Sequence, residues 1–552
     1  MSDTFDFVVV GGGSGGCVLG GRLTEDPATS VCLLEAGGKG DDALIRMPVG
    51  AVTMIPTHLN NWAFETVPQS GLGGRRGYQP RGRALGGSSA VNAMVYIRGH
   101  RSDYDDWARQ GANGWSYDEV LPYFRLSEHN ERIHDAWHGS DGPLWVSDPR
   151  TDSPLHAAFL EAGRQAGHAV NTDFNGAEQE GVGVYQLTQK HGERCSAARA
   201  YLLPHLRQRS NLEVRTKAQA LRVLFEGRRA VGVEYLQDGV VRSVRARREV
   251  ILAAGALQTP QLLMLSGVGP MHALAAQGLP LVMHLPGVGQ NLQDHPDFVF
   301  GYRMDSTDAM GVSVRGGLRM AREALRYRRE RRGMLTSNFA ECGGFLRSRP
   351  DAERPDLQLH FVVAVVDDHA RRFHAGHGLS CHVCLLRPRS RGSVSLANRD
   401  PLAPPLIDPA FYADGQDLED MVRGFRITQK IMQAPALAQR LGRDMFTQGV
   451  ETDEQIRAVL RARTDTVYHP VGTCRMGSDE NAVVDPQLRV RGLDRLRIAD
   501  ASVMPTLIGG NTNAPTIMIA EKAVDLILGR QRIAPEQAAS PLTAPEADHA
   551  LA

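Results

Sequence analysis

The sequence is poor in cysteine and has no long apolar run. Its 552 residues include seven cysteines, an odd and thinly spread set, unlike the dense pattern of a disulfide-stapled secreted domain. No apolar stretch approaches the roughly 18 residues that a membrane-spanning helix needs. Residues 1–6 lack the basic and apolar regions of a secretory signal peptide. These absences predict a cytoplasmic protein in a reducing compartment.

The chain also lacks an excess of charge of either sign. Lys and Arg number 62, as do Asp and Glu, so no overall field attracts nucleic acid, which we exclude as a partner. With 42% hydrophobic residues the composition is that of a globular protein, and the length predicts more than one domain. The 58 glycines are numerous and clustered, which is typical of backbone that lies close to a ligand.

The first glycine cluster follows a short apolar run at residues 7–10 that is typical of a buried strand. Gly11, Gly13 and Gly16 fit the G-x-G-x-x-G pattern, in which a tight turn leads into a helix whose N-terminus faces a pyrophosphate. A second apolar run ends in Glu35, at the spacing where a carboxylate binds adenosine ribose hydroxyls. The sequence therefore predicts one dinucleotide site, since no second unit of this kind follows downstream.

Two further glycine-containing segments are candidates for the same site. Residues 82–92 either cradle a phosphate or ring carbonyl with backbone N–H groups, or form a plain loop, and both readings remain open. Residues 249–252 predict a strand that returns to the nucleotide sheet. It is followed by Ala254 and then by a helix over 259–267 with Pro260 in its first turn. Alternation over 211–216, 220–225 and 230–235 predicts a β-meander.

The C-terminal third carries three polar groups at chain turns. His469 lies between a tyrosine and a proline, and Asp500 follows a strand-like run. Asn513 stands just before a helix predicted to start at Pro515 and to end at Gly529, with Ile517, Ala520, Val524, Ile527 and Leu528 on one face. The positive end of that helix dipole can stabilise negative charge on a bound ring system.

Together these motifs resemble the glucose-methanol-choline family of FAD oxidoreductases. The resemblance covers residues 5–529 and rests on the segments 11–16 with Glu35, 86–89 with Asn92, 253–256, 469–473 and 511–516. Within the family the chain is most similar to the branch that contains choline-dehydrogenase-like and aliphatic alcohol dehydrogenases, as residues 381–394 suggest.

The resemblance implies an α/β fold with two parts. A Rossmann-like FAD-binding domain would be assembled from the discontinuous segments 1–155, 190–297 and 456–530. A substrate domain with an antiparallel β-sheet would comprise 156–189 and 298–455. The sequence agrees, because residues 298–455 lack dinucleotide turns and contain alternating stretches such as 357–363. The composition of 531–552, rich in Pro and Ala, favours disorder.

The resemblance also implies roles for individual residues. His469 would be the general base that takes the hydroxyl proton of a primary alcohol while a hydride moves to flavin N5, and Asn513 would be its partner. FAD would be non-covalent, because Val91 occupies the position where some members carry a linking histidine. The residues expected to hold FAD are Gly11, Gly13, Ser14, Gly16, Glu35, Ala36, Arg83, Gly86, Gly87, Ser88, Asn92, Ala93, Val95, Ala220, Ala254, Asp500, Ala501 and Thr512.

The electron acceptor is expected to be a quinone, with oxygen as the alternative. A hydroxynitrile lyase that keeps its flavin as structure, and an NAD-dependent Rossmann dehydrogenase, are functions of other classes. The motifs leave open whether the alcohol is aliphatic, aromatic or choline, and they leave open the oligomeric state.

Three remaining features have competing interpretations. Cys381 and Cys384 are more typical of a strand in the core than of a metal or redox pair, because residues three apart in a strand point to opposite faces. No metal site is expected. Glu341 either lines the substrate pocket, where it could hold a cation, or pairs with an arginine. The arginine-rich run 319–332 predicts a basic helix, for which a solvated face is the more frequent explanation and peripheral contact with an anionic membrane the alternative.

Overall fold

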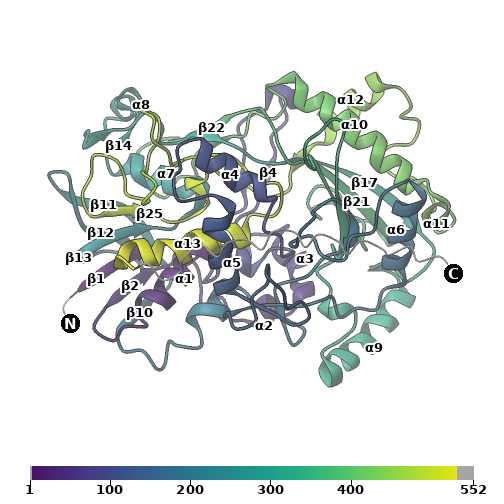
Figure 1. The fold of residues 1–552 in the computed structure, drawn as a ribbon, viewed down its shortest axis with the longest axis horizontal. Helices are drawn as coiled ribbons and strands as arrows, with labels where there is room; N and C mark the ends of the chain where they lie inside the picture. Colours follow the sequence, from purple (N-terminus) through teal and green to yellow (C-terminus); the bar gives the residue numbers. More distant parts are fainter. Residues whose placement is uncertain (1–2, 531–552) are drawn as a thin grey trace, which may run out of the picture.

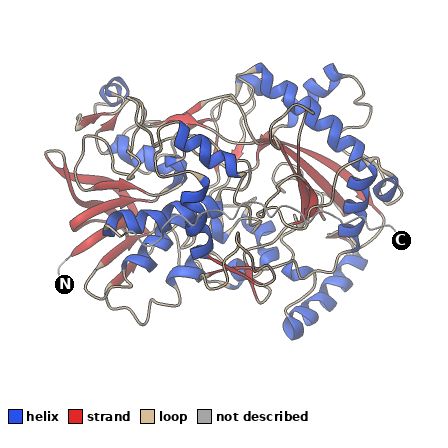
Figure 2. Cartoon of the chain, in the orientation of Figure 1, coloured by secondary structure: helices blue, strands red, loops and turns tan. Residues whose placement is uncertain are grey.

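Two β-sheets at opposite ends of the molecule organise the computed structural model, which describes residues 3–530 (Figure 1). Helices cover the sheets and fill the space between them (Figure 2). The predicted mixed α/β fold with an antiparallel second sheet is therefore confirmed. None of the helices in residues 3–530 combines the length and apolarity needed to cross a bilayer.

The first sheet has the strand order β10-β2-β1-β13-β12-β11, and β25 also pairs with β13. Its central strands run parallel to one another, while β11, β12 and the start of β13 form antiparallel hairpins. The strands are β1 (Thr4–Val10), β2 (Val31–Leu34), β10 (Leu212–Arg215), β11 (Ala218–Glu226), β12 (Arg229–Gln237), β13 (Val240–Leu252) and β25 (Leu496–Ile498).

The second sheet has the order β24-β17-β21-β20-β19-β7, with β18 paired to β21. All of its strand pairs are antiparallel. The strands are β7 (Gly181–Val184), β17 (Pro296–Met304), β18 (Gly311–Val312), β19 (Cys342–Leu346), β20 (Leu357–Val362), β21 (Gly376–Leu385) and β24 (Asp465–Thr466).

Helices of very different lengths surround these sheets. The longer ones are α1 (Ser14–Leu23), α4 (Arg101–Arg109), α5 (Tyr117–Ser127), α6 (Pro154–Gln165), α7 (Gly255–Leu265), α9 (Val314–Glu330), α10 (Gly415–Met432), α12 (Asp453–Arg463) and α13 (Asn513–Leu528). The shorter ones are α2 (Ala43–Arg46), α3 (Ala51–Met54), α8 (Met271–Ala276) and α11 (Pro435–Ala438).

The remaining described strands form small sheets. They are β3 (Phe64–Glu65) with β4 (Tyr78–Gln79), β5 (Glu128–Asn130) with β6 (Leu144–Val146), β8 (Gln189–Lys190) with β9 (Glu193–Arg194), β14 (Val268–Gly269) with β15 (Met283–His284), and β16 (Gln290–Leu292) with β22 (Gly392–Ser395) and β23 (Leu406–Asp408).

The first glycine turn connects β1 to α1 as predicted, and glycine lets α1 pack against its neighbours. A Cβ at Gly16 would lie 1.8 Å from the carbonyl oxygen of Gly11, and one at Gly15 would lie 2.3 Å from that of Ala499. Helix α1 therefore sits directly on the end of β1, with α13 against its other side. The helix macrodipole of α1 consequently points its positive end at the carboxyl edge of the sheet.

The prediction placed this helix at 259–267, but helix α7 starts at Gly255, four residues earlier. The predicted first turn was therefore wrong. The carboxylate of Asp500 accepts a hydrogen bond from the Gly255 N–H at 2.9 Å and stabilises the early start. Pro260 therefore lies inside the helix and leaves the carbonyl of Ala256 without its usual donor. The hydroxyl of Thr473 donates to that carbonyl at 2.6 Å and compensates for the missing N–H.

The predicted β-meander is confirmed for 220–225 and 230–235, which lie in β11 and β12, but its third strand is β13 and not residues 211–216. That segment forms β10, which pairs in parallel with β2 at the edge of the nucleotide sheet. Alternation of side chains marks a strand but carries no information about its partner, so the assignment to the meander was wrong. Residues 249–252 do return to the sheet, beside β1.

The two faces of strand β20 in the second sheet have different surroundings. Leu357, Leu359 and Phe361 belong to an apolar core that also includes residues of α10. The alternate residues Gln358 and His360 are buried as well, because they face the interior between the two sheets. The sheet therefore presents polar side chains to a space that solvent hardly reaches.

The second core also receives residues from the range 456–530, which the prediction assigned to the FAD domain. Ile456 and Leu460 of α12 lie in that core, and β24 pairs with β17. The start of this range thus packs with the second sheet. The other domain boundaries stay a prediction, and the tail 531–552 lies outside the described residues.

The cysteines are core residues, as predicted for Cys381 and Cys384. All seven are buried and unbonded. Cys381 packs in the core beneath the second sheet, whereas Cys384 belongs to a separate cluster with Tyr185 and Phe345. The two thiols therefore point to opposite faces of β21, which excludes a shared metal ion.

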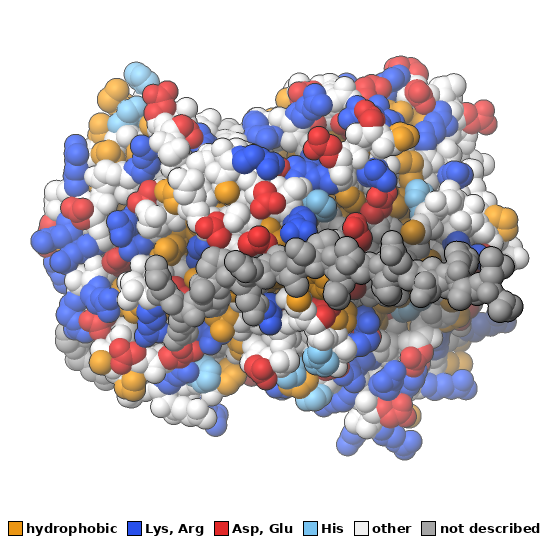
Figure 3. Space-filling view, viewed as in Figure 1, with side chains coloured by type: hydrophobic (Ala, Val, Ile, Leu, Met, Phe, Trp, Pro, Cys, Tyr) orange, Lys and Arg blue, Asp and Glu red, His pale blue; other side chains and the backbone are white. Residues whose placement is uncertain are grey.

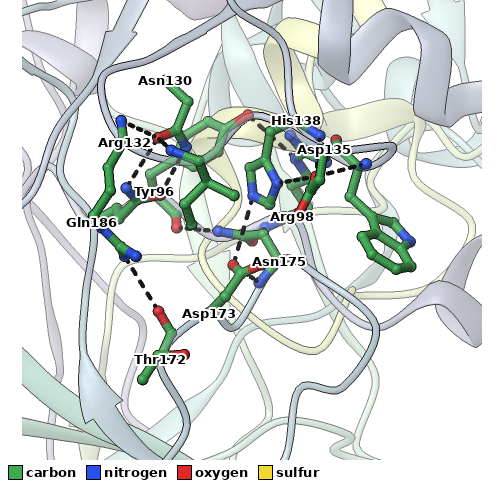
Figure 4. A network of polar contacts seen from close by, with 12 residues as sticks. Tyr96, Arg98, Asn130, Arg132, Asp135, His138, Thr172, Asp173, Asn175 and Gln186 are labelled. Carbon is green, nitrogen blue, oxygen red and sulfur yellow. Dashed lines mark hydrogen bonds and ion pairs between the residues drawn. The ribbon is translucent and has the colours of Figure 1, made fainter.

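A buried polar network fixes the loops beside α4 and α5 (Figure 4). The His138 ring lies between two carboxylates, with Nδ1 2.7 Å from Asp135 and Nε2 3.6 Å from Asp173. Burial lowers the pKa of this histidine, but the two carboxylates outweigh that effect and raise it. Each ring nitrogen of His138 faces one carboxylate, an arrangement that favours the charged form of the ring.

We predict that Gly16→Ala destabilises the protein by about 2 kcal/mol or more, because the added methyl overlaps the Gly11 carbonyl. Chemical unfolding followed by circular dichroism measures the change. Gly317→Ala in α9 is the matched control, since nothing lies within 4 Å of the methyl it adds. It should leave stability unchanged or raise it slightly. Equal unfolding midpoints for both variants would contradict the packing described here.

Candidate active site

A cavity of about 390 Å³ runs between the two sheets. At one end it is lined by Glu35 and the glycine turns, and at the other by His469, His360 and the segment 364–366. Its volume lies in the usual range for ligand pockets of a few hundred to about 1,000 Å³. One continuous cavity therefore joins the predicted nucleotide site to the predicted catalytic histidine.

At the nucleotide end of the cavity, backbone segments from different parts of the chain lie very close together. A Cβ at Gly11 would lie 2.5 Å from the Ala253 carbonyl oxygen, and Gly11 has φ = +100°. A Cβ at Gly87 would lie 2.7 Å from the Cα atom of Gly13. The segment 82–92 thus packs on the first glycine turn and lines the cavity, which decides between the two readings of that segment in favour of a contact with the site.

The α1 N-terminus at this end has no side-chain cap, since Gly13 occupies the N-cap position. The first N–H groups of a helix have no partner inside the helix. Here they lie at the wall of the cavity, where Ser14 and Gly15 are lining residues. The arrangement can accommodate an anionic group.

Glu35 accepts two backbone hydrogen bonds beside this turn, from Gly12 at 2.9 Å and from Gly37 at 2.7 Å. Burial raises the pKa of its carboxyl to about 7, although both hydrogen bonds oppose the rise. The carboxylate therefore has a fixed orientation at the end of β2 and is positioned to accept hydrogen bonds from hydroxyl groups.

Most of the residues predicted to hold the cofactor line the cavity. They are Gly11, Gly13, Ser14, Glu35, Ala36, Gly87, Ser88, Asn92, Ala93, Val95, Ala220, Ala254, Asp500, Ala501 and Thr512. Gly16, Arg83 and Gly86 do not line it. Gly16 packs on Gly11, Gly86 donates its N–H to the Gly12 carbonyl at 2.7 Å, and the guanidinium of Arg83 stacks 4.3 Å from the Trp62 ring.

The loop that carries His469 is held by a buried carboxylate. Asp294 accepts the His469 N–H at 2.9 Å and the Thr466 hydroxyl at 2.5 Å. Tyr468 has φ = +78°, which is unfavourable for a bulky residue and turns the chain so that the next side chain enters the cavity. The surrounding loop therefore determines the position of the His469 ring.

The two ring nitrogens of His469 have different partners. Nδ1 lies 3.0 Å from Nδ1 of His295, and Nε2 lies 3.1 Å from Nδ2 of Asn511. The amide of Asn511 is oriented by Gln358 on β20, which donates to its Oδ1 at 3.0 Å. With Nδ2 as a donor, Nε2 of His469 is an acceptor, so the ring proton is on Nδ1.

The environment keeps His469 neutral. Burial lowers the pKa of its ring well below the usual 6.5, and His295, His360 and Arg81 lower it further. Burial also lowers the pKa of His295 and of His360, each to about 3. A neutral imidazole whose lone pair is on Nε2 can act as a base toward a hydroxyl group.

Asn513 also lines the cavity, but Asn511 is the residue hydrogen-bonded to His469, so the catalytic pairing of His469 with Asn513 stays a prediction. Oδ1 of Asn513 accepts the Ser14 hydroxyl at 2.7 Å, which ties the start of α13 to the start of α1. Helix α13 begins at Asn513, two residues before the predicted Pro515, and Thr512 is its N-cap. Asn511 therefore lies just outside the helix, where its side chain can turn toward the histidine.

Sequence reasoning missed Asn511 as the residue hydrogen-bonded to His469, and it also missed His295, Gln358 and Asp294. Asn511 was visible as the first member of an Asn-x-Asn pair at a helix start, but the pattern alone does not rank the two. His295 and Asp294 directly precede the long strand β17, which is a signal of a functional loop end. Gln358 was visible only as a polar position in an alternating strand.

The half of the cavity beyond His469 is mostly apolar. Phe339, Val362, Val365 and Val467 line it together with the small side chains of Ala340, Ala364 and Ala370. The carboxylates that line the cavity are Glu35 and Asp500, and Asp500 is bonded to Gly255 and Thr259. Glu341 is not among the lining residues. It pairs with His156 at 2.6 Å and with Thr151, so the expectation of an arginine partner was wrong.

Comparison with known proteins identifies the class of enzyme that this arrangement belongs to. The GMC oxidoreductase models match residues 5–297 for the N-terminal part and 388–520 for the C-terminal part. The chain therefore belongs to the GMC oxidoreductase family, which confirms the resemblance found in the sequence.

Curated relatives cover nearly the whole chain. An alcohol dehydrogenase [acceptor] from Pseudomonas putida is 47% identical and covers 95% of this chain and 96% of its own length. The mitochondrial choline dehydrogenase of Homo sapiens is 46% identical and covers 96% of this chain and 90% of its own.

Solved structures show the same fold. Pyridoxine 4-oxidase from Mesorbium loti has a TM-score of 0.86 at 32% identity and covers 95% of this chain and 99% of its own. A formate oxidase variant from Aspergillus oryzae has a TM-score of 0.89 at 28% identity over 96% and 98% of the two chains. The fold of this chain thus recurs in proteins that share 28–32% of its sequence.

We predict that His469 stays neutral in the folded protein as the pH falls from about 8 to about 5.5, because its pKa is lowered below the usual value of about 6.5. Nitrogen NMR of histidine-labelled protein measures the charge of each ring, and the His469→Gln variant assigns the signal. In urea the same ring should titrate near its usual pKa. A His469 transition near pH 6.5 in the folded protein would contradict the burial described above.

Proposed function

We propose that this protein oxidises a primary alcohol to an aldehyde with FAD as its cofactor. The observation that carries the proposal is the neutral His469, whose Nε2 lies 3.1 Å from the Asn511 amide inside a cavity that reaches the glycine turns. A base and a hydrogen-bond donor that face the same point can bind one hydroxyl oxygen between them. Membership of the GMC oxidoreductase family supports the reaction class.

The residues of the cavity fit FAD. The uncapped N-terminus of α1 would hold the pyrophosphate, and Glu35 would accept the hydroxyls of the adenosine ribose. At the other end, the buried atoms Asn338 Oδ1 and His360 Nδ1 have no hydrogen-bond partner among residues 3–530, although Asn338 and His360 line the cavity. Buried polar groups of this kind are normally satisfied by a ligand or by water.

His469 and Asn511 have complementary tasks toward the alcohol. A hydroxyl group placed against both would donate its proton to Nε2 of His469 and accept a hydrogen bond from Nδ2 of Asn511. As the proton leaves, the Asn511 amide stabilises the negative charge that develops on oxygen. When bound, FAD supplies the acceptor for the hydride that leaves the carbinol carbon.

His295 and Gln358 act on the reaction through these two side chains. His295 accepts a hydrogen bond from the Nδ1–H of His469, so Nε2 of His469 remains unprotonated and faces the cavity. Gln358 holds the Asn511 amide with its NH₂ group toward the histidine. Both are positioning residues, because each fixes the orientation of a group that contacts the substrate.

An uncharged, apolar alcohol suits the cavity better than choline does. Valine, alanine and phenylalanine side chains make up most of the substrate half, its polar lining residues include His360 and His469, and the lining carboxylates lie on the cofactor side. Burial of a cationic ammonium group without a carboxylate partner is costly. The relative named alcohol dehydrogenase [acceptor] supports this substrate class.

We also propose that FAD is dissociable and that a quinone-type acceptor reoxidises it. Val91 lines the cavity at the position expected for a covalent link, and a valine side chain offers no nucleophile. The name of the relative from Pseudomonas putida, alcohol dehydrogenase [acceptor], supports an acceptor other than oxygen. A cytoplasmic location stays a prediction from the sequence.

Substitutions should distinguish the contributions of Asn511 and Asn513 to the reaction. We expect His469→Ala to slow flavin reduction by alcohol about a hundredfold or more, the usual effect of losing a general base. Asn511→Ala should slow it about tenfold to a hundredfold by removing a donor to the developing charge. Asn513→Ala, the matched control, should have a much smaller effect on this rate. Anaerobic stopped-flow absorbance measures the rates, with FAD content checked for each variant.

A larger loss for Asn513→Ala than for Asn511→Ala would contradict the assignment of the partner residue. Unchanged reduction by the His469→Ala variant would exclude His469 as the base. Release of the flavin by acid precipitation tests the proposed non-covalent binding, since a covalent flavin would remain with the protein pellet.

A substrate panel tests the reaction itself. We expect anaerobic mixing with 1-octanol to bleach the flavin absorbance near 450 nm, with benzyl alcohol slower and choline ineffective, because the substrate half of the cavity is apolar. A soluble quinone should then restore the absorbance faster than air does. Rapid recovery in air would indicate an oxidase. Bleaching by choline alone would contradict the apolar substrate class, and no bleaching by any alcohol would favour the lyase.

A further inference from the structure

Helix α9 projects from the molecule at the end that carries the second sheet (Figure 1). It is attached by a few contacts on one side, where Gly316 and Tyr327 are buried and Glu323 accepts the N–H of Met334 at 2.7 Å. The space-filling view shows lysine and arginine side chains gathered on this projection, at the lower right (Figure 3). The remaining sides of the helix face solvent.

An apolar stripe runs along the outward side of α9. Val314 is 85% exposed, Leu318 66% and Leu325 58%. With Ala321, which is also exposed, these residues recur every three or four positions, so they share one face of the helix. Large aliphatic side chains are rarely this exposed in a row on a protein that stays in water.

Four arginines with no ion-pair partner among residues 3–530 stand beside the stripe. Helical spacing places Arg315, Arg322 and Arg329 along one border and Arg328 along the other, and all four are exposed. The arginines nearer the protein body do have partners, since Arg326 pairs with Asp152 and Arg319 with Asp308. The outward face therefore carries uncompensated positive charge on both sides of an apolar centre.

We propose that the outward face of α9 binds the surface of an anionic lipid bilayer. An apolar stripe bordered by arginines matches such a surface, because the stripe enters the acyl boundary while the guanidinium groups contact acidic headgroups. Nucleic acid would satisfy the arginines but not Leu318 and Leu325. The charge of the whole chain is zero, so the attraction comes from this face and not from the protein as a whole.

The same edge of the molecule continues toward the substrate half of the cavity. Strand β18, directly before α9, pairs Val312 with Gly376 of β21. Val312 is 62% exposed, and Phe373, three residues before Gly376, is 71% exposed. The segment that leads to Phe373 includes Ala364 and Ala370, which line the cavity. Docking through α9 would therefore bring the apolar end of the cavity toward the bilayer. Lipid binding by this face is independent of the reaction proposed above.

Flotation of the full-length, flavin-loaded protein with vesicles tests the proposal. The vesicles are phosphatidylcholine alone or phosphatidylcholine mixed with phosphatidylglycerol, at low salt and at about 0.5 M salt. We expect the protein to float with the mixed vesicles at low salt and to remain in solution with the neutral ones. High salt should weaken the binding, because it screens the arginines.

Two variants separate the apolar and the charged contributions. Leu318→Ser with Leu325→Ser, and Arg322→Gln with Arg329→Gln, should each weaken vesicle binding about tenfold or more. The matched controls change exposed residues at the opposite end of the molecule. They are Val240→Ser with Val241→Ser, which are 53% and 56% exposed, and Arg228→Gln with Arg242→Gln. Both controls should bind as the wild type does.

Activity with a soluble quinone, flavin content and unfolding midpoint should be the same in all four variants, so that loss of vesicle binding is not loss of folding. Wild-type protein that stays in solution with the anionic vesicles would overturn the proposal. Equal binding by the α9 variants and their controls would also overturn it. A dimer that dissociates in the Leu318→Ser, Leu325→Ser variant would assign the face to a second copy of the chain instead.

Discussion

The close backbone approach at the carboxyl edge of the first sheet is the constraint on which the rest of the structure depends. Gly11 touches the loop after β13, and Gly87 touches Gly13, at distances that no side chain would permit. These contacts bring three segments far apart in the sequence to one point. They also leave the N-terminus of α1 facing the cavity, while Asn513 connects α13 to Ser14 at the same place. Without the glycines the segments would stand apart, and the cavity would have no wall here.

The second constraint on the site is that His469 stays neutral in a space that water hardly reaches. Burial alone would favour the uncharged ring, and the neighbouring histidines and Arg81 reinforce this. One ring nitrogen of His469 faces His295 and the other faces Asn511, and this arrangement places the lone pair of the ring on Nε2. The second sheet takes part in that arrangement, because Gln358 on β20 orients the Asn511 amide. The sheet is thus both a wall of the cavity and the source of the hydrogen bond that orients the Asn511 amide.

Local sequence patterns predicted elements whose cause is local. The apolar run before Gly11, the G-x-G-x-x-G spacing and the Pro-Val-Gly-Thr stretch after His469 each depend on a few neighbouring residues. The errors concern choices that depend on distant partners. Helix α7 starts early because Asp500, far along the chain, caps it, and Thr473 satisfies the carbonyl that Pro260 leaves free. Residues 211–216 alternate like a hairpin strand, yet they pair with β2 because the chain returns to the sheet edge there.

The sequence by itself determined the family, the glycine turns that approach a nucleotide, the position of Glu35 after its strand and the histidine in its loop. These follow from residue types and spacings along the chain. Only the tertiary structure decided that Asn511 and not Asn513 meets the histidine, and that Glu341 turns away from the cavity to His156. It also decided that the apolar stripe of α9 faces outward. The physical reason is the same in each case: the direction of a side chain is set by the contacts of its backbone with segments that the sequence does not place beside it.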